Sequence, residues 1–324
     1  MKENILGLHH ITAITGNPQK NYDFYTKVLG LRMVKKTVNF DAPDTYHFYY
    51  GNEQGTPGTI LTFFSWENID RGFTGVGMAE EIGYSVPYGS LDFWQERFKQ
   101  LNITFAGKNE RFGEEYLSFI DGDGLNSSLI IPKIADERKS WETKEIGKDF
   151  AIKGFQGITL SLKKIDKTAK VLTDILGYRL MSQEDNRYRF ITDSVQSASI
   201  VDLLENADGA AGRNAIGTIH HLAFRVANEN IQMEYREKIL SSGLQITPKI
   251  DRNYFYSVYF HEPGGVLFEI ATDNPGFTVD EPLSELGTHL KLPKQFEHAR
   301  VEILLSQNLC LFLLFPMIFF HQQF

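Results

Sequence analysis

Apolar and polar positions follow the same order in two distant parts of the chain. When the sequence is aligned with itself without gaps, offset so that residue 29 meets residue 176, Leu29-Gly30 aligns with Leu176-Gly177. Each copy has a short apolar strand and then an amphipathic helix, predicted over 17–28 and 164–175. A glycine follows where a helix commonly ends in a left-handed residue. Further apolar segments come after each glycine, so both copies predict one strand, one helix and about three more strands.

A second shift relates two further segments in the same way. It carries Gly124 onto Gly265, and each copy has an amphipathic helix upstream, over 91–101 and 231–240. Both copies end in two strands joined by a glycine-containing turn. Repeats of this kind indicate a duplicated supersecondary unit. The chain is therefore interpreted as four βαβββ units, at about 7–66, 80–133, 154–206 and 217–273.

The predicted fold class is α+β, with the four units forming two paired-unit domains. The N-terminal domain is expected at 5–133 and the C-terminal domain at 154–273, each with two units. The charged segment 134–153 between them has the composition of a linker. Residues 274–324 follow as an extension and an apolar tail, both outside the repeats.

Two histidine pairs and one glutamate distinguish the units from one another. Unit one carries His9-His10 on its first strand, and unit four carries His220-His221 on its own. Glu269 lies in the apolar last strand of unit four, where an unpaired charge is costly to bury. Two imidazoles and one carboxylate form the facial triad that holds non-haem Fe(II) with open coordination positions. The sequence therefore predicts a metal site.

Simpler interpretations of these residues stay open. The histidines fit hydrogen-bonded core positions, with Glu269 paired to an arginine such as Arg252. Asp202 in unit three is a competing strand carboxylate, but its unit has no histidine on the first strand. His47 fits a hydrogen-bonded strand residue better than a ligand, and Gly55–Thr59 fits a turn better than a phosphate loop.

Composition and charge narrow the classes of partner. The 324 residues include 33 Lys and Arg against 41 Asp and Glu, for a net charge of −8. A nucleic-acid partner is not expected, because such proteins carry an excess or a stripe of basic residues. Cys310 is the only cysteine, so the chain can form neither an intrachain disulfide nor a multi-cysteine metal site. The expected location is cytoplasmic.

The tail contains 12 consecutive apolar residues, Leu309 to Phe320. A membrane-spanning helix needs about 20, and Pro316 interrupts the run, so no membrane partner is expected. The tail is predicted to be disordered or packed on a surface patch. Deletion of residues 304–324 is expected to leave metal binding unchanged.

These features together resemble the vicinal oxygen chelate superfamily, whose fold is built from paired βαβββ units and which includes glyoxalases and extradiol dioxygenases. More narrowly, residues from about 5 to 297 are similar to hydroquinone-type ring-cleaving dioxygenases. The resemblance is carried by Leu8-His9-His10-Ile11-Thr12, Gly55–Thr59, Arg111-Phe112-Gly113, Ile219-His220-His221 and the strand with Glu269.

The resemblance implies a role for each matching position. It implies metal ligands at His10, His221 and Glu269, so that units one and four would form the site. The positions implied around the substrate are His9, Thr12, His220, Arg252 and Tyr259. Either of these histidines would act as an acid or base. The arginine would hold an anionic oxygen, and the tyrosine would donate a hydrogen bond.

The predicted function is an Fe(II)-dependent extradiol-type dioxygenase that opens the ring of hydroquinones or related dihydroxybenzenes with O2. Fe(II) is the expected cofactor, with Mn(II) and Zn(II) as alternatives, because such a site binds several divalent ions. The expected partners are a small aromatic substrate and O2, and a homo-oligomer is left open.

Two other functions compete with the dioxygenase. A glyoxalase-like metal isomerase or lyase usually draws four protein ligands, whereas the position in unit one that matches Glu269 is about Thr62. A metal-free binding protein that sequesters an aromatic compound would have a vacant or missing triad.

Overall fold

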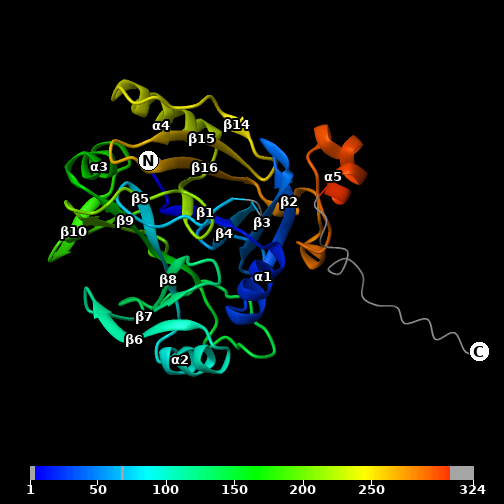
Figure 1. The fold of residues 1–324 in the computed structure, drawn as a ribbon. Helices are drawn as coiled ribbons and strands as arrows, with labels where there is room; N and C mark the ends of the chain where they lie inside the picture. Colours follow the sequence, from blue (N-terminus) through cyan, green and yellow to red (C-terminus); the bar gives the residue numbers. More distant parts are fainter. Residues whose placement is uncertain (1–3, 67–68, 307–324) are drawn as a thin grey trace, which may run out of the picture.

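The computed structural model describes residues 4–66 and 69–306, and its strands form two eight-stranded curled sheets (Figure 1). The strands of the first sheet are β1 (Leu8–Thr15), β2 (Arg32–Asn39), β3 (Ala42–Gly51), β4 (Ile60–Ser65), β13 (Ile219–Val226), β14 (Ile250–Asp251), β15 (Phe255–His261) and β16 (Leu267–Pro275). The strands of the second sheet are β5 (Met78–Ser85), β6 (Thr104–Arg111), β7 (Glu114–Ile120), β8 (Asn126–Ile130), β9 (Gly154–Leu162), β10 (Arg179–Glu184), β11 (Arg187–Ile191) and β12 (Ile200–Glu205). The orders are β14-β15-β16-β13-β1-β4-β3-β2 and β10-β11-β12-β9-β5-β8-β7-β6. The predicted α+β class with four βαβββ units is confirmed.

The helices begin and end close to the predicted positions. They are α1 (Pro18–Asp23) continued by the π turn η1 (Phe24–Val28), α2 (Leu91–Gln100), α3 (Asp166–Lys170) continued by the π turn η2 (Val171–Ile175), and α4 (Glu229–Ser241). The extension contains the 3₁₀ helices η3 (Phe277–Val279), η4 (Leu283–Glu285) and η5 (Lys294–Ala299), followed by the α-helix α5 (Arg300–Ser306). Gly30 and Gly177, which follow the helices of units one and three, have φ of 70° and 75°. Glycine adopts this conformation without the cost that a side chain adds, which explains why the helices end there.

Each sheet joins units from both halves of the chain. β1 of unit one pairs antiparallel with β13 of unit four, and β5 of unit two pairs antiparallel with β9 of unit three. The predicted domains 5–133 and 154–273 therefore do not coincide with the sheets, and as independent folding units they stay a prediction. The first strand of every unit offers a similar apolar edge, so the sequence pattern does not select which units pair.

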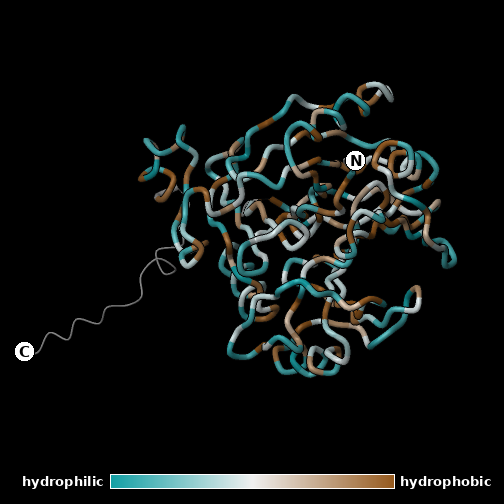
Figure 2. Tube along the Cα trace, turned by 180° about the vertical axis from the view of Figure 1, so that it is seen from behind, coloured by the Kyte–Doolittle hydropathy of each residue, from teal (hydrophilic) through white to brown (hydrophobic). Residues whose placement is uncertain are grey.

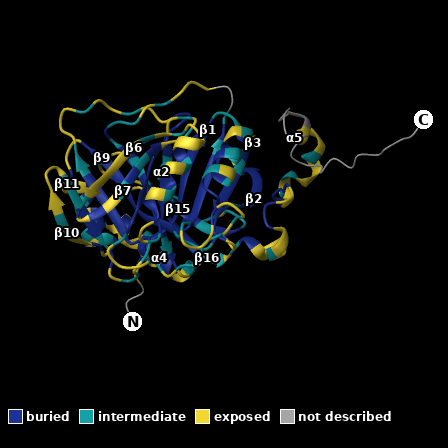
Figure 3. Cartoon of the chain, turned by 90° about the horizontal axis from the view of Figure 1, so that it is seen from below, coloured by how far each residue is buried: buried dark blue, intermediate teal, exposed yellow. Residues whose placement is uncertain are grey.

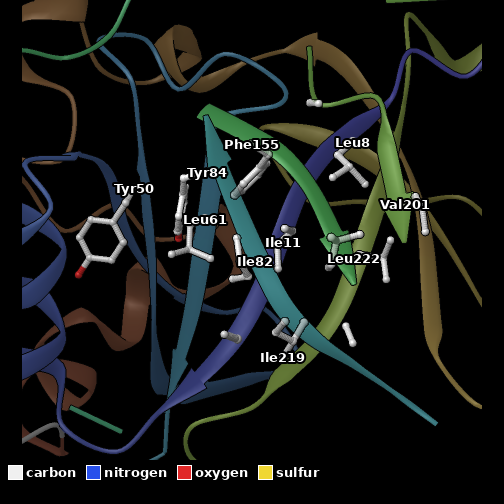
Figure 4. Packing of buried hydrophobic residues seen from close by; sticks show 14 of the residues in the cluster. Leu8, Ile11, Tyr50, Leu61, Ile82, Tyr84, Phe155, Val201, Ile219 and Leu222 are labelled. Atoms are coloured by element: carbon white, nitrogen blue, oxygen red, sulfur yellow. The ribbon is translucent and has the colours of Figure 1, made fainter. Parts of the chain in front are cut away.

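The core lies where the two sheets face each other. Ile11 and Leu222 of the first sheet belong to one buried cluster with Ile82 and Phe155 of the second sheet (Figure 4). Most central strands are buried, whereas the edge strands β6 and β10 and the helices α2 and α4 carry exposed residues (Figure 3). Viewed from behind, hydrophilic residues dominate many of the peripheral turns (Figure 2). Burial of this apolar interface stabilises the relative position of the sheets.

The charged segment 134–153 is tied to both sheets. Nη1 of Arg138 donates to the backbone oxygen of Gly58, at 2.8 Å, and Nη2 donates to that of Phe155, at 2.7 Å. Asp136 accepts from Nε and Nη2 of Arg138 and fixes the guanidinium in this position. The segment therefore fastens the sheets together in addition to connecting units two and three.

No helix within residues 4–66 and 69–306 is long and apolar enough to cross a membrane. The apolar run Leu309 to Phe320, for which disorder or surface packing is predicted, lies outside the described residues.

Candidate metal and substrate site

Three side chains from neighbouring strands converge at one point of the first sheet. β1 supplies His10, β13 supplies His221 and β16 supplies Glu269. Nε2 of His10 and Nε2 of His221 lie 3.2 Å and 3.0 Å from the same carboxylate oxygen, Oε2 of Glu269. One potential ligand atom from each residue lies within 4.8 Å of the others, and all three side chains are buried. Units one and four therefore bring together the three residues that the resemblance implied as ligands.

β-bulges place the two histidines of each pair side by side. The register of β1 and β13 shifts by one residue at two places, where His9 and His220 are the extra residues. Bulges are common next to functional sites, where they re-aim side chains. Nδ1 of His9 lies 3.0 Å from Nδ1 of His10, and Nδ1 of His220 lies 2.8 Å from Nδ1 of His221. The Nε2 atoms of His10 and His221 are thereby left to face the carboxylate.

Hydrogen bonds fix the proton positions on His9 and His10. Nε2 of His9 lies 3.1 Å from the backbone oxygen of Thr272, which only accepts, so His9 carries a proton on Nε2. Burial and the neighbouring His10 lower the pKa of His9 well below its usual value, so this ring is neutral and its Nδ1 accepts. His10 must then donate from Nδ1, which leaves a lone pair on its Nε2. A metal ligand needs this tautomer.

The carboxylate of Glu269 is only partly satisfied by the surrounding side chains. Oγ of Ser257 donates to Oε1 at 2.5 Å, whereas Oε2 receives no hydrogen bond from the residues that the structure describes. Burial acts to raise the pKa of Glu269, but protonated His10 and His221 beside it would hold that pKa well below its usual value. A buried anionic oxygen without a donor, faced by two imidazole nitrogens, fits a divalent cation.

A cavity of about 340 Å³ opens beside these three residues. Thr12, His220, Arg252 and Tyr259 line it, as expected for positions around a substrate. His9 is not among the lining residues within the described chain; its ring contacts His10. Much of the remaining wall consists of Phe40, His47, Tyr49, Phe64, Trp66 and Phe255. A cavity with many aromatic rings and a group of polar side chains suits a small aromatic ligand that carries polar substituents.

Arg252 and Tyr259 form a polar side of the cavity. Nε of Arg252 donates to Oη of Tyr259 at 3.2 Å, and Nη2 lies 3.0 Å from Oδ2 of Asp41. Arg252 therefore pairs with Asp41, and not with Glu269 as the simpler interpretation had it. Burial acts to lower the pKa of Arg252, but Tyr259 and Asp41 raise it; burial and Glu269 raise the pKa of Tyr259. Both side chains keep their protons and can donate to an anionic oxygen.

The matching region of the second sheet lacks this set of residues. By strand register, Gly157 and Ser128 lie where His10 and Glu269 lie in the first sheet. A side chain at 157 would meet the backbone oxygen of Ile200 at 2.7 Å from its Cβ, so the strands approach too closely for a ligand there. Within the described chain, a group of three residues that could hold a metal ion occurs in the first sheet alone.

Asp202, the competing carboxylate, belongs to an ion-pair network in the second sheet. Arg189 donates to both of its oxygens, at 2.9 Å and 3.0 Å, and a third nitrogen of the same guanidinium lies 2.5 Å from Glu114. The space left beside these groups is only about 10 Å³. Asp202 is thus neutralised by an arginine and has no room for a ligand.

Sequence reasoning missed the contribution of His47, Tyr49 and Thr62 to the site. His47 is a hydrogen-bonded strand residue, as predicted, but it also lines the cavity together with Tyr49. Thr62 lies directly behind, on β4. The alternation of β3 places 47 and 49 on one face, and this pattern could have linked them to the site.

Comparison with known proteins agrees with this geometry. The sequence profile described as "Glyoxalase/Bleomycin resistance protein/Dioxygenase superfamily" matches residues 7–125 and 154–270. The chain belongs to this superfamily. A relative in Bacillus subtilis strain 168, named "Putative ring-cleaving dioxygenase MhqO", is 45% identical over 305 residues, which cover 94% of this chain and 96% of the relative. The "Chlorohydroquinone/hydroquinone 1,2-dioxygenase" of Sphingobium indicum is 33% identical over 314 residues, or 95% and 98% of the two chains.

Solved structures of the superfamily support the same assignment. The crystal structure of a "putative dioxygenase" from Bacillus subtilis has a TM-score of 0.89 at 43% identity and covers 94% of this chain and 97% of its own. Glyoxalase I from Zea mays has a TM-score of 0.63 at 13% identity, with 87% and 97% covered. At that identity the likeness to glyoxalase I shows the fold alone.

Proposed function

We propose that the chain is an Fe(II)-dependent, extradiol-type dioxygenase that opens the aromatic ring of hydroquinones or related dihydroxybenzenes with O2. The observation that carries the proposal is the convergence of His10, His221 and Glu269 next to an aromatic cavity of about 340 Å³, which the two histidines line. Relatives named as ring-cleaving and hydroquinone dioxygenases, similar over more than nine tenths of the chain, support it.

The donor set suits a divalent metal with open positions. His10, His221 and Glu269 would hold the ion through two imidazole nitrogens and one carboxylate oxygen, a set that leaves coordination positions for other ligands. Bound there, Fe(II) would bring a substrate oxygen and O2 together and let electrons pass from the ring to oxygen. One carboxylate against a 2+ ion leaves a net positive charge, which favours a phenolate over a neutral phenol.

The cavity residues would bind and orient the ring. The Arg252 guanidinium supplies a positive charge for an anionic oxygen, and its contact with Tyr259 leaves the hydroxyl proton of the tyrosine for the ligand. Burial and His221 lower the pKa of His220 to about 3, so this imidazole is neutral. With Nδ1 accepting from Nδ1 of His221, its Nε2–H can donate to a substrate oxygen. His9 would instead act through His10, whose tautomer it fixes.

Oxygen consumption tests the proposal. Purified protein is reconstituted with Fe(II) without oxygen and then mixed with O2 and a panel of hydroquinones and catechols. The expected result is iron bound at one ion per chain and O2 uptake with hydroquinones. Protein that neither binds iron nor consumes O2 with any member of the panel contradicts the proposal.

The same preparation separates the alternatives. Loading with zinc or nickel and isomerisation of a thiol adduct would identify a glyoxalase-like isomerase. Tight binding of an aromatic compound without metal or turnover would identify a sequestering protein. We also propose a cytoplasmic location, which fractionation would test. Light scattering would show whether the chain forms a homo-oligomer.

A further inference from the structure

Thr62 lies at the position in unit one that Glu269 holds in unit four. In the parallel pairing of β13 and β16, Glu269 lies opposite the residue two positions after His221. In the parallel pairing of β1 and β4, Thr62 lies opposite Thr12, two positions after His10. A four-ligand site would have a carboxylate in place of Thr62. This chain has a buried hydroxyl there instead.

The correspondence extends to the neighbouring strands. Tyr259 lies opposite Glu269 in the pairing of β15 and β16, and Tyr49 lies opposite Thr62 in the pairing of β3 and β4. Two residues before each tyrosine, Ser257 and His47 fill matching positions. Ser257 donates to the carboxylate of Glu269, and Nε2 of His47 lies 2.8 Å from Oγ1 of Thr62. Both units therefore hold the residue at the ligand position by a hydrogen bond from the adjacent strand.

The hydrogen bonds in unit one run in a single direction. Oγ1 of Thr62 donates to Oγ1 of Thr12 at 3.0 Å. A threonine hydroxyl has one proton, so Thr62 must accept from His47, which carries its proton on Nε2. Nδ1 of His47 is then an acceptor, and Oη of Tyr49, 3.0 Å away, donates to it. The chain of donors is Tyr49 to His47 to Thr62 to Thr12.

This chain of bonds determines what Thr12 can do. Its oxygen already accepts from Thr62, so its own proton is directed elsewhere, and Thr12 lines the cavity beside His10. Both nitrogens of His47 are occupied, so His47 has none left to contact a ligand directly. Buried networks in which every member is satisfied hold polar groups in one orientation.

We propose that His47, acting through Thr62, holds the hydroxyl of Thr12 as a hydrogen-bond donor to an anionic oxygen of the aromatic substrate. The inference rests on the proposed function and deepens it: His47, Tyr49 and Thr62 are positioning residues at the place of a fourth ligand. Their effect is on binding and orientation of the phenolate, with metal binding left to His10, His221 and Glu269.

The experiment uses pairs of variants that differ only in hydrogen bonding. Thr62→Val and His47→Leu remove the donors, whereas Thr62→Ser and His47→Gln retain one. Affinity for unsubstituted hydroquinone is measured by calorimetry without oxygen on metal-loaded protein, along with metal content and kcat and KM. His298→Leu, at an exposed histidine of the extension, is the matched control.

Thr62→Val and His47→Leu are expected to weaken hydroquinone binding about tenfold to a hundredfold, the range for a hydrogen bond to a charged group. Thr62→Ser and His47→Gln should recover most of the affinity, and metal content should not change. The effect of His47→Leu should vanish in a Thr12→Val background, because no donor is left to orient. A purely structural role would give no rescue and no such dependence on Thr12.

The outcomes separate this inference from the proposed function. Wild-type protein that neither binds hydroquinone nor consumes O2 overturns both. Wild-type binding with equal affinity in Thr62→Val overturns the inference alone. The ¹⁵N resonances of the His47 ring give a readout independent of activity: the inference requires the proton on Nε2, and a proton on Nδ1 contradicts it. If Thr62→Val fails to fold, the inference is still tested by the tautomer of His47 and by the hydroquinone affinities of Thr62→Ser and His47→Gln.

Discussion

Nε2 of His10 lies 3.2 Å from Oε2 of Glu269, although one residue is near the start of the chain and the other is in the last strand of the repeats. The contact exists because β1 and β16 both flank β13 in the first sheet. The proposed metal site therefore depends on the pairing of unit one with unit four.

Removal of any one member of the triad should abolish stable metal binding. One of the three donor atoms is deleted in each of His10→Ala, His221→Ala and Glu269→Gln. Metal affinity should therefore fall by more than the 10- to 100-fold loss that is typical when a residue hydrogen-bonded to a metal ligand is replaced. Metal content after dialysis, measured by atomic emission, checks this. His298→Ala should keep full metal content. Retention of one metal per chain in Glu269→Gln would place the site elsewhere.

Replacement of His9 should weaken metal binding without removing a ligand. His9→Phe takes away the acceptor that keeps the Nδ1 proton on His10, so metal affinity is expected to fall about 10- to 100-fold. His9→Gln can still donate to the backbone oxygen of Thr272 and should lose less. Titration with a competing chelator measures both variants. Unchanged metal affinity in His9→Phe, together with lost turnover, would instead support a direct acid or base role.

Asp202→Asn should destabilise the fold while leaving metal binding intact. The change removes one of the two carboxylates paired with buried Arg189, so the cost should lie at the lower end of the about 3–5 kcal/mol for breaking a buried ion pair. Urea unfolding gives the free energy of unfolding, and metal content is measured alongside it. The matched control is Asp193→Asn, which breaks the exposed contact with Arg179 and should change stability little. Loss of metal in a folded Asp202→Asn variant would revive Asp202 as a ligand.

Asp136 should make stability depend on pH. Burial acts to raise the pKa of Asp136, but the hydrogen bonds and charge of Arg138 lower it below its usual value. The stabilisation is therefore complete above the unfolded pKa of about 3.9 and is lost as pH falls through the lower folded value. Asp136→Asn should cost about 1–3 kcal/mol at pH 7, and the difference should shrink below about pH 4. Urea unfolding at several pH values checks this, with Asp149→Asn as control; a difference that stays constant with pH would contradict it.

The sequence predicted the elements well because their signals are local. Helix ends at Gly30 and Gly177 follow from the conformation that glycine tolerates, and the apolar periods around them define the strands. Which units pair depends on long-range contacts between strand edges that are similarly apolar. The pairing of unit one with unit four was therefore expected from the family resemblance and not from the hydrophobic pattern.

The site was predictable in its residue types and less so in its geometry. His10, His221 and Glu269 were prominent because charged and imidazole side chains are unusual in apolar strands. The bulges at His9 and His220 leave no mark in the sequence, and they place His10 and His221 with Nε2 toward Glu269. His47 and Thr62 were named in the sequence analysis but given no role in the site, because a hydroxyl and an ordinary strand histidine become informative only when their partners are known.

The pairing of β1 with β13 also orders the events of synthesis. β1 is synthesised before the other strands of its sheet, yet its partner strand β13 and Glu269 come only in the last third of the chain. Until then His10 lies on an unpaired strand edge, which other chains can join. A nascent or prematurely terminated chain therefore has no complete triad, and the full chelate forms only once synthesis has passed the last strand of the repeats.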